Sequence, residues 1–129
     1  MVAETHAYAG RILRVNLSNG KITTDRTETY AERFLGGRGI NQCILFGETK
    51  PDIQPFDPAN PIIFGAGALV GTPALGACRY SVDSRNALTG GVGSANSGGH
   101  FGPELKFAGY DHVVIEGRSP KPRYILICD

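Results

Sequence analysis

The chain has 129 residues and a formal net charge of +1. That length suffices for one domain with a buried core, and the charge gives no reason to expect nucleic acid or an anionic membrane as partner. No apolar run approaches the roughly 20 residues that span a bilayer, and the polar N-terminus lacks the apolar stretch of a signal peptide, so we expect a cytoplasmic protein.

The N-terminal part of the chain predicts a β-hairpin. Residues 11–17 alternate apolar and polar side chains, as a half-buried strand does. Asn19-Gly20 is a strong hairpin signal, and the polar residues 21–26 are expected to return as the partner strand.

Two short helices are expected next. The first covers residues 28–35, with Thr27 as its cap and Gly36 at its end, and the second covers residues 40–47. The prolines of residues 51–61 then predict an irregular, extended connection.

The rest of the chain predicts further strands and one helix. We expect strands at residues 62–64, 79–83, 113–116 and 123–127, a turn at 86–91, and a helix from Pro103 to Gly109. The last two strands are expected to form a hairpin. Because hairpin connections dominate, the predicted class is α+β: a mainly antiparallel β-sheet base with a few short helices and glycine-rich loops, in one domain of residues 1–129.

Glycine is the outstanding residue type, with 18 copies gathered in a few clusters. Such clusters mark tight turns or close approach of the backbone to a ligand. The most informative stretch is residues 94–110, where Asn96, Gly98 and a helix start at Pro103 stand close together. Backbone N–H groups exposed by glycines and by a helix N-terminus form a ready anion site.

Several common catalytic and binding motifs are disfavoured. The run Gly65–Gly71 resembles a dinucleotide fingerprint, but Thr72-Pro73 interrupts the helix that such a loop must open. Ser97 and His100 lack an acidic third partner, so a turn serine and a loop histidine are favoured over a catalytic pair. We therefore assign no catalytic residue to this chain.

The three cysteines, Cys43, Cys78 and Cys128, are odd in number and widely spaced. This excludes a complete internal disulfide framework and a CxxC metal site. Reduced, mostly buried thiols are expected, with a metal or cluster ligand role as the alternative.

Three polar residues are candidates for binding oxygen-rich groups. Arg79, at a strand start after a glycine-rich loop, suits a phosphate or a polar heterocycle, and a structural salt bridge is the alternative. Arg38, between Gly37 and Gly39, has the same ambiguity. Asn96 can offer an oxygen to Mg²⁺, and an Asx turn is the alternative.

Together these pieces resemble the N-terminal domain of the aldehyde:ferredoxin oxidoreductase family. The landmarks run nearly from end to end of the chain in matching order. They are Gly10–Leu17, Phe34–Gly39, Gly71-Thr72-Pro73, Arg79–Val82, Leu88–Gly91, Asn96–Gly99 and Phe101–Asp111. The resemblance covers essentially all of this chain but only the first portion of a family enzyme, whose later helical domains are absent here.

The resemblance implies an oxidoreductase that converts aldehydes to carboxylic acids and passes electrons to ferredoxin. It implies tungsten or molybdenum held by two pterins whose phosphates share a Mg²⁺, with a 4Fe–4S cluster ligated by residues outside this chain. By position, Arg79 resembles the family arginine between pterin and cluster. Asn96 resembles the residue whose oxygen helps to hold the Mg²⁺ or a pterin phosphate, and Gly98 resembles a backbone contact to the pterin.

Two hypotheses follow. In the first, the chain is the cofactor-cradling N-terminal domain of such an enzyme, with the remaining domains or subunits as partners, and it is inactive alone. In the second, it is a stand-alone structural or assembly subunit that docks onto a separate catalytic subunit. The first hypothesis predicts that the isolated chain exposes a large apolar face, because a domain taken from a larger enzyme lacks the parts that would cover that face.

Overall fold

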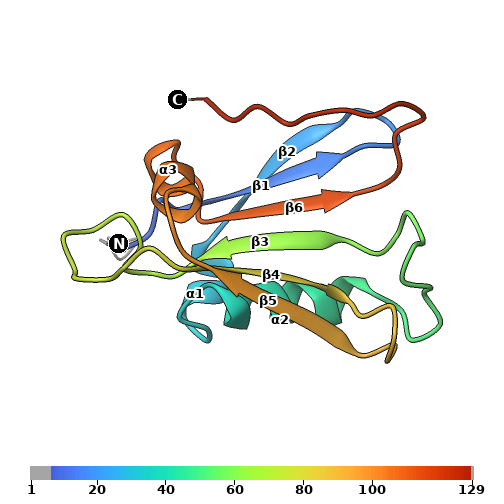
Figure 1. The fold of residues 1–129 in the computed structure, drawn as a ribbon, viewed down its shortest axis with the longest axis horizontal. Coiled ribbons are helices and arrows are strands. Elements are labelled where there is room, and N and C mark those ends of the chain that lie inside the picture. Colours follow the sequence, from blue (N-terminus) through green and yellow to red (C-terminus); the bar gives the residue numbers. More distant parts are fainter. Residues whose placement is uncertain (1–6, 129) are drawn as a thin grey trace.

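The structure is a computed structural model that describes residues 7–128. Within this range the chain forms one mixed sheet of six strands in the order β2-β1-β6-β3-β4-β5, together with three helices (Figure 1). The strands are β1 (Arg11–Asn16), β2 (Ile22–Arg26), β3 (Ile62–Ala66), β4 (Tyr80–Arg85), β5 (Val92–Ser97) and β6 (His112–Glu116). The helices are α1 (Glu28–Ala31), α2 (Arg38–Glu48) and α3 (Phe101–Phe107). The polar N-terminal residues, on which the signal-peptide argument rests, lie outside the described range.

The predicted α+β class and the N-terminal hairpin are confirmed. β1 and β2 pair antiparallel, with Val15 opposite Ile22 beside the turn. Gly20 adopts a φ of +72° in that turn, a conformation that glycine reaches without steric cost.

β6 lies in the middle of the sheet, although it comes last in the chain. It pairs parallel with β1, where Leu13 lies opposite Val113, and antiparallel with β3, where Ile63 lies opposite Val114. Both edges of β6 are therefore occupied, which makes the predicted hairpin between residues 113–116 and 123–127 wrong. Residues 121–127 form no strand and instead run extended past the sheet (Figure 1).

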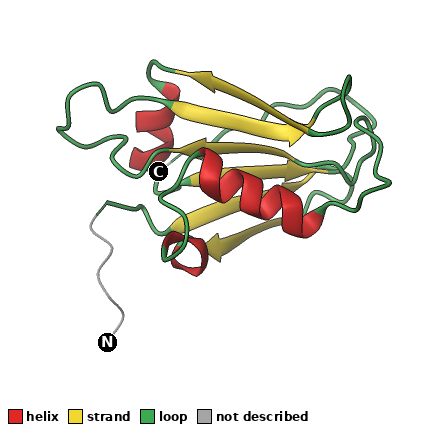
Figure 2. Cartoon of the chain, turned by 90° about the horizontal axis from the view of Figure 1, so that it is seen from below, coloured by secondary structure: helices red, strands yellow, loops and turns green. Residues whose placement is uncertain are grey.

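The two faces of the sheet carry separate hydrophobic cores. Alternate residues of the same strands face opposite sides, so Ile12 packs toward α2 while its neighbour Leu13 packs toward α3. The α2 core consists of Ile12, Ile40, Ile44, Leu45, Ile63 and Val114. The α3 core consists of Leu13, Val15, Leu105 and Val113, with Ile127 packed against it. Figure 2 shows α2 lying along one face of the strands.

The helices differ in detail from the prediction. α1 ends at Ala31, and Thr27 does not cap it, because its buried hydroxyl donates to the carboxylate of Asp111 instead. α3 begins at Phe101, ahead of Pro103, because the first four N–H groups of a helix need no partner within it and proline is tolerated there. In the described part of the chain, no helix has both the length and the apolar character to cross a membrane.

One strand was missed. Val92–Ser97 forms β5, the edge strand beside β4. The sequence suggested an Asx turn as the alternative role of Asn96, whereas the structure places it near the end of this strand, opposite Ser81.

Candidate cofactor site

Segments far apart in the sequence meet where β3 and β5 end and β4 begins, a region we call the glycine-rich end (residues 36–39, 65–71, 76–79 and 96–102). The Gly37 amide donates to the Ala66 carbonyl over 2.9 Å, and the Gly67 amide donates to the Arg79 carbonyl over 3.4 Å. α2 therefore begins beside the last residue of β3, with its N-terminus at this end.

Some of these glycines are needed for packing between loops. Gly36 has a φ of +124°, and a Cβ there would lie 3.3 Å from the Ala68 nitrogen. At Gly102, a Cβ would lie 3.1 Å from the Val70 side chain and 3.2 Å from the Cys78 carbonyl oxygen. These positions exclude larger side chains for reasons of the fold alone.

Gly98 and Gly99 differ from the packing glycines. A Cβ at Gly98 would make only an ordinary contact, at 3.6 Å from the Cys78 sulfur, and a Cβ at Gly99 would have no described neighbour within 4 Å, although the φ of +91° at Gly99 itself favours glycine. The backbone of this pair is therefore open to a group that approaches from outside the chain, as a cradle for a large cofactor requires.

Arg79 and Asn96 contact one another at the same end. The Arg79 Nε–H donates to Asn96 Oδ1, while Asn96 Nδ2 donates to the Tyr80 carbonyl (3.0 Å) and to Ser81 Oγ (3.3 Å). These bonds to β4 fix the orientation of the amide, so that its oxygen faces the arginine. An amide oxygen has two lone pairs, which leaves one for a cation or a further donor.

The charge of Arg79 is not neutralised by the described residues. Both Arg79 and Asn96 are exposed, and the ion pairs found within residues 7–128 do not involve Arg79. Within the described part of the chain, a structural salt bridge therefore does not account for Arg79. Its terminal N–H groups, which have no hydrogen-bond partner among residues 7–128, can bind an anion or an oxygen-rich heterocycle.

The other sequence candidates contribute less. Arg38 is the first residue of α2 and is exposed, so it adds a second cation at this end. Ser97 and His100 form no hydrogen bond with each other, and Ser97 Oγ contacts only the neighbouring Gly98 carbonyl at 3.5 Å. Within residues 7–128, no three His, Cys, Asp or Glu side chains gather as a metal site. The three cysteines are free but not buried as expected: Cys43 and Cys78 are half-buried, and Cys128 is exposed.

A buried polar network beneath the site was missed by the sequence analysis. Asn41 Nδ2, on α2, donates to Asp83 Oδ2 (2.8 Å) and to the carbonyls of Ile63 and Ser81 (3.2 Å each). Its amide oxygen lies 2.7 Å from His112 Nδ1. The sequence indicated this network only by placing polar residues, Asn41 and His112, among the apolar residues of a helix and a strand.

This network fixes the protonation state of His112. Because the Asn41 oxygen accepts, His112 carries its proton on Nδ1, and burial lowers the pKa of His112 to about 4 by disfavouring the imidazolium ion. The amide of Asn41 thus ties α2 to β3, β4 and β6 and sets where the N-terminus of α2 lies at the glycine-rich end.

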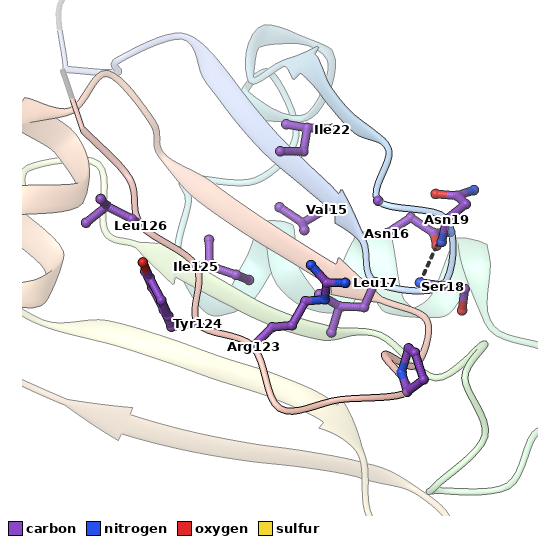
Figure 3. Close-up of a pocket in the computed structure, with 12 residues that line it drawn as sticks. Val15, Asn16, Leu17, Ser18, Asn19, Ile22, Arg123, Tyr124, Ile125 and Leu126 are labelled. Carbon is purple, nitrogen blue, oxygen red and sulfur yellow. Dashed lines mark hydrogen bonds between the residues drawn. The ribbon is translucent and has the colours of Figure 1, made fainter.

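A cavity of about 470 Å³ lies at the opposite end of the sheet. Figure 3 shows Val15, Leu17 and Ile22 of the β1–β2 hairpin on one side of it and Arg123, Tyr124 and Ile125 on the other. It is separate from the arginine and the glycines described above.

Comparison with known proteins agrees with this architecture. Residues 12–129 match the family described as "Aldehyde ferredoxin oxidoreductase, N-terminal domain". The chain is 48% identical to the tungsten-containing aldehyde ferredoxin oxidoreductase of Pyrococcus horikoshii, over 95% of this chain and 20% of that protein. It is 32% identical to the aliphatic sulfonate oxidoreductase WOR-like subunit of Pyrococcus furiosus, again over 95% of this chain and 20% of the relative.

A solved structure shares the fold. The active site complex BamBC of benzoyl coenzyme A reductase, in complex with 1,5 dienoyl-CoA, superposes with a TM-score of 0.86 at 40% identity. The match covers 89% of this chain and 18% of that chain. The chain thus spans about one fifth of the length of the relatives that it matches.

Proposed function

The chain belongs to the family of aldehyde ferredoxin oxidoreductase N-terminal domains, and from that premise we propose that it holds a tungsten–pterin cofactor within a larger oxidoreductase. The observation that carries the proposal is the Arg79 guanidinium, which has no ion-pair partner among the described residues and is oriented by Asn96 beside the open backbone of Gly98 and Gly99.

The residues at the glycine-rich end fit such a cofactor. Arg79 supplies a cation for phosphate or pterin oxygens, and the Gly98 backbone admits a flat ring system at close range. The remaining lone pair of Asn96 Oδ1 suits a Mg²⁺ shared with the phosphates, since Mg²⁺ takes oxygen ligands. The chain itself contributes binding and orientation.

When bound, the tungsten centre supplies the redox chemistry, which we propose is the oxidation of an aldehyde to a carboxylic acid. The 48% identity to tungsten-containing aldehyde enzymes supports this substrate class over the aliphatic sulfonates named for the relative at 32% identity. Electrons would leave to ferredoxin through a 4Fe–4S cluster whose ligands lie outside this chain. Alone, the chain is therefore expected to be inactive.

The experiment that tests the proposal is anaerobic purification of the native protein that carries this sequence, followed by intact mass and analysis of tungsten, molybdenum and iron. We expect a polypeptide several times larger than this chain, with tungsten and iron bound. A native species of 13.7 kDa without these metals would contradict the proposal and favour a stand-alone subunit.

A further inference from the structure

The extended segment at residues 123–127 has the features of a strand that lacks its partner. It follows Gly117–Pro122 and runs past the face of the sheet without joining it (Figure 1). Within residues 7–128, no hydrogen bond is found for any backbone N–H or C=O of residues 123–127. Unpaired backbone edges of this kind are a template for pairing with another strand.

The side chains of the segment alternate as in a strand. Ile127 packs against the α3 core, and Ile125 lies on the same side, partly covered at 39% exposure. Tyr124 and Leu126 are 87% and 73% exposed. An outward row of apolar side chains on a segment rich in β-forming residues is typical of a strand covered on both faces.

The segment is also packed loosely within the chain. The cavity of about 470 Å³ separates it from the β1–β2 hairpin (Figure 3), and a second cavity of about 270 Å³ separates it from α3. Phe101, Leu105 and Ala108 line the second cavity. The segment therefore contacts the rest of the chain mainly through Ile125 and Ile127, and a cavity lies on each side of it.

We propose that residues 123–127 pair through their backbone with a β-strand from the part of the enzyme outside this chain. This inference rests on the proposed function, because that function places the chain in a larger polypeptide. Most of the length of each relative lies outside the match, so the family enzymes have chain to supply the strand. β6 cannot supply it, since both its edges are paired.

The surroundings define the chemistry of the partner strand. The side chains of the partner strand that lie beside Tyr124 and Leu126 would be their cross-strand neighbours, so we expect them to be apolar. Lys121 lies just before the segment and Arg123 is its first residue, and neither forms an ion pair with the described residues, so carboxylates are expected at the corresponding end of the partner. This mode of recognition is the addition of one strand to another.

Hydrogen–deuterium exchange tests the inference directly. The native enzyme and the isolated 129-residue chain are compared at the amides of residues 123–127, with the amides of β6 (His112–Glu116) as the internal standard that shows the sheet to be folded in both. We expect exchange at least about 100-fold slower in the native enzyme, because pairing protects these N–H groups. Tyr124→Lys in the native enzyme should reduce that protection, whereas Phe56→Lys, an equally exposed aromatic in the proline-rich loop, should not.

The outcomes separate this inference from the proposed function. An enzyme that holds tungsten and iron but exchanges residues 123–127 as fast as the isolated chain overturns the strand pairing alone. A native protein without metals in which the segment is protected by a separate chain overturns the proposed function and its premise of a larger polypeptide. Protection that rises with concentration in the isolated chain identifies a second copy as the partner and also overturns the inference.

Discussion

Lys106 Nζ lies 2.5 Å from Asp111 Oδ1, and both side chains are almost fully buried. Asp111 also accepts hydrogen bonds from the Ala9 and Gly10 amides and from the Thr27 hydroxyl, over 2.7–2.9 Å. Asp111 lies directly before β6. Its carboxylate therefore connects this end of β6 with α3 through Lys106, with the residues before β1 through Ala9 and Gly10, and with the residue before α1 through Thr27. Burial alone would raise the pKa of Asp111, but the hydrogen bonds from Lys106, Thr27 and Ala9 outweigh burial and hold the pKa below its usual value.

Removing this carboxylate should destabilise the isolated chain strongly. Asp111→Ala leaves the Lys106 ammonium buried without its partner, and we expect a loss of about 3 to 5 kcal/mol in the free energy of unfolding. Urea unfolding at pH 7 measures this loss. As a control, Asp57→Ala removes a carboxylate from the exposed proline-rich loop and should cost far less; equal effects would contradict the role of Asp111.

His112 should make the stability of the chain depend on pH between about 4 and 6.5. The pKa of His112 is lowered to about 4 in the folded chain, so only the unfolded chain takes up this proton in that window. Stability is therefore full above pH 6.5 and should fall by about 3 kcal/mol as the pH drops to 4. Urea midpoints measured across this range test the slope. His100→Gln, an exposed histidine, should leave it unchanged, whereas His112→Gln should remove most of it.

Two glycine substitutions should have opposite effects. A Cβ at Gly65 would overlap both Asn41 Oδ1 and His112 Nδ1, so Gly65→Ala should destabilise the chain by about 3 kcal/mol. Gly47 lies in α2 with no described neighbour within 4 Å of a Cβ. Gly47→Ala should therefore stabilise the chain by about 0.5 to 1 kcal/mol, since alanine favours the helix. Thermal unfolding of the Gly65→Ala and Gly47→Ala variants measures both effects. Unchanged melting temperatures in both variants would contradict the packing described around Gly65 and Gly47.

The residues of the candidate site should control metal content without controlling the fold. Arg79→Ala in the native enzyme should lower the tungsten bound per polypeptide, and Asn96→Ala, which frees the guanidinium, should weaken retention about 10-fold or more. Both side chains are exposed, so the free energy of unfolding should change by less than about 0.5 kcal/mol in Arg79→Ala, and by about 1 kcal/mol in Asn96→Ala, which loses its hydrogen bonds to β4. Arg26→Ala, at an exposed position of β2, is the control. Full tungsten content in Arg79→Ala would refute the assignment of the site.

The sequence predicted what depends on local pattern. The alternation of residues 11–17, the Asn19-Gly20 turn and the apolar run at 113–116 led directly to β1, its hairpin and β6. β5 was missed because Val92–Ser97 has few β-forming residues and is mostly exposed. This segment is a strand because it pairs with β4, and that pairing cannot be read from the local sequence.

The candidate site could be predicted only in part. Arg79 and Asn96 were selected from residue type and from the resemblance, and their binding to a cofactor stays a prediction. Their mutual hydrogen bond depends on the register in which Ser81 lies opposite Asn96, which no local pattern encodes. Asn41 and His112 were likewise invisible as a pair, because they meet only once α2 has packed across β3, β4 and β6.

The central place of β6 also determines when this domain can form during its synthesis. β1 and β3 do not pair with each other and are joined only through β6, about 100 residues after β1 along the chain. Until the ribosome has released residues 112–116, the inner edges of β1 and β3 have no partner, and the α2 core lacks Val114. Such long-range pairing is slow and leaves strand edges open to aggregation. We therefore expect these strand edges to stay exposed in the nascent chain until nearly all of this segment has emerged.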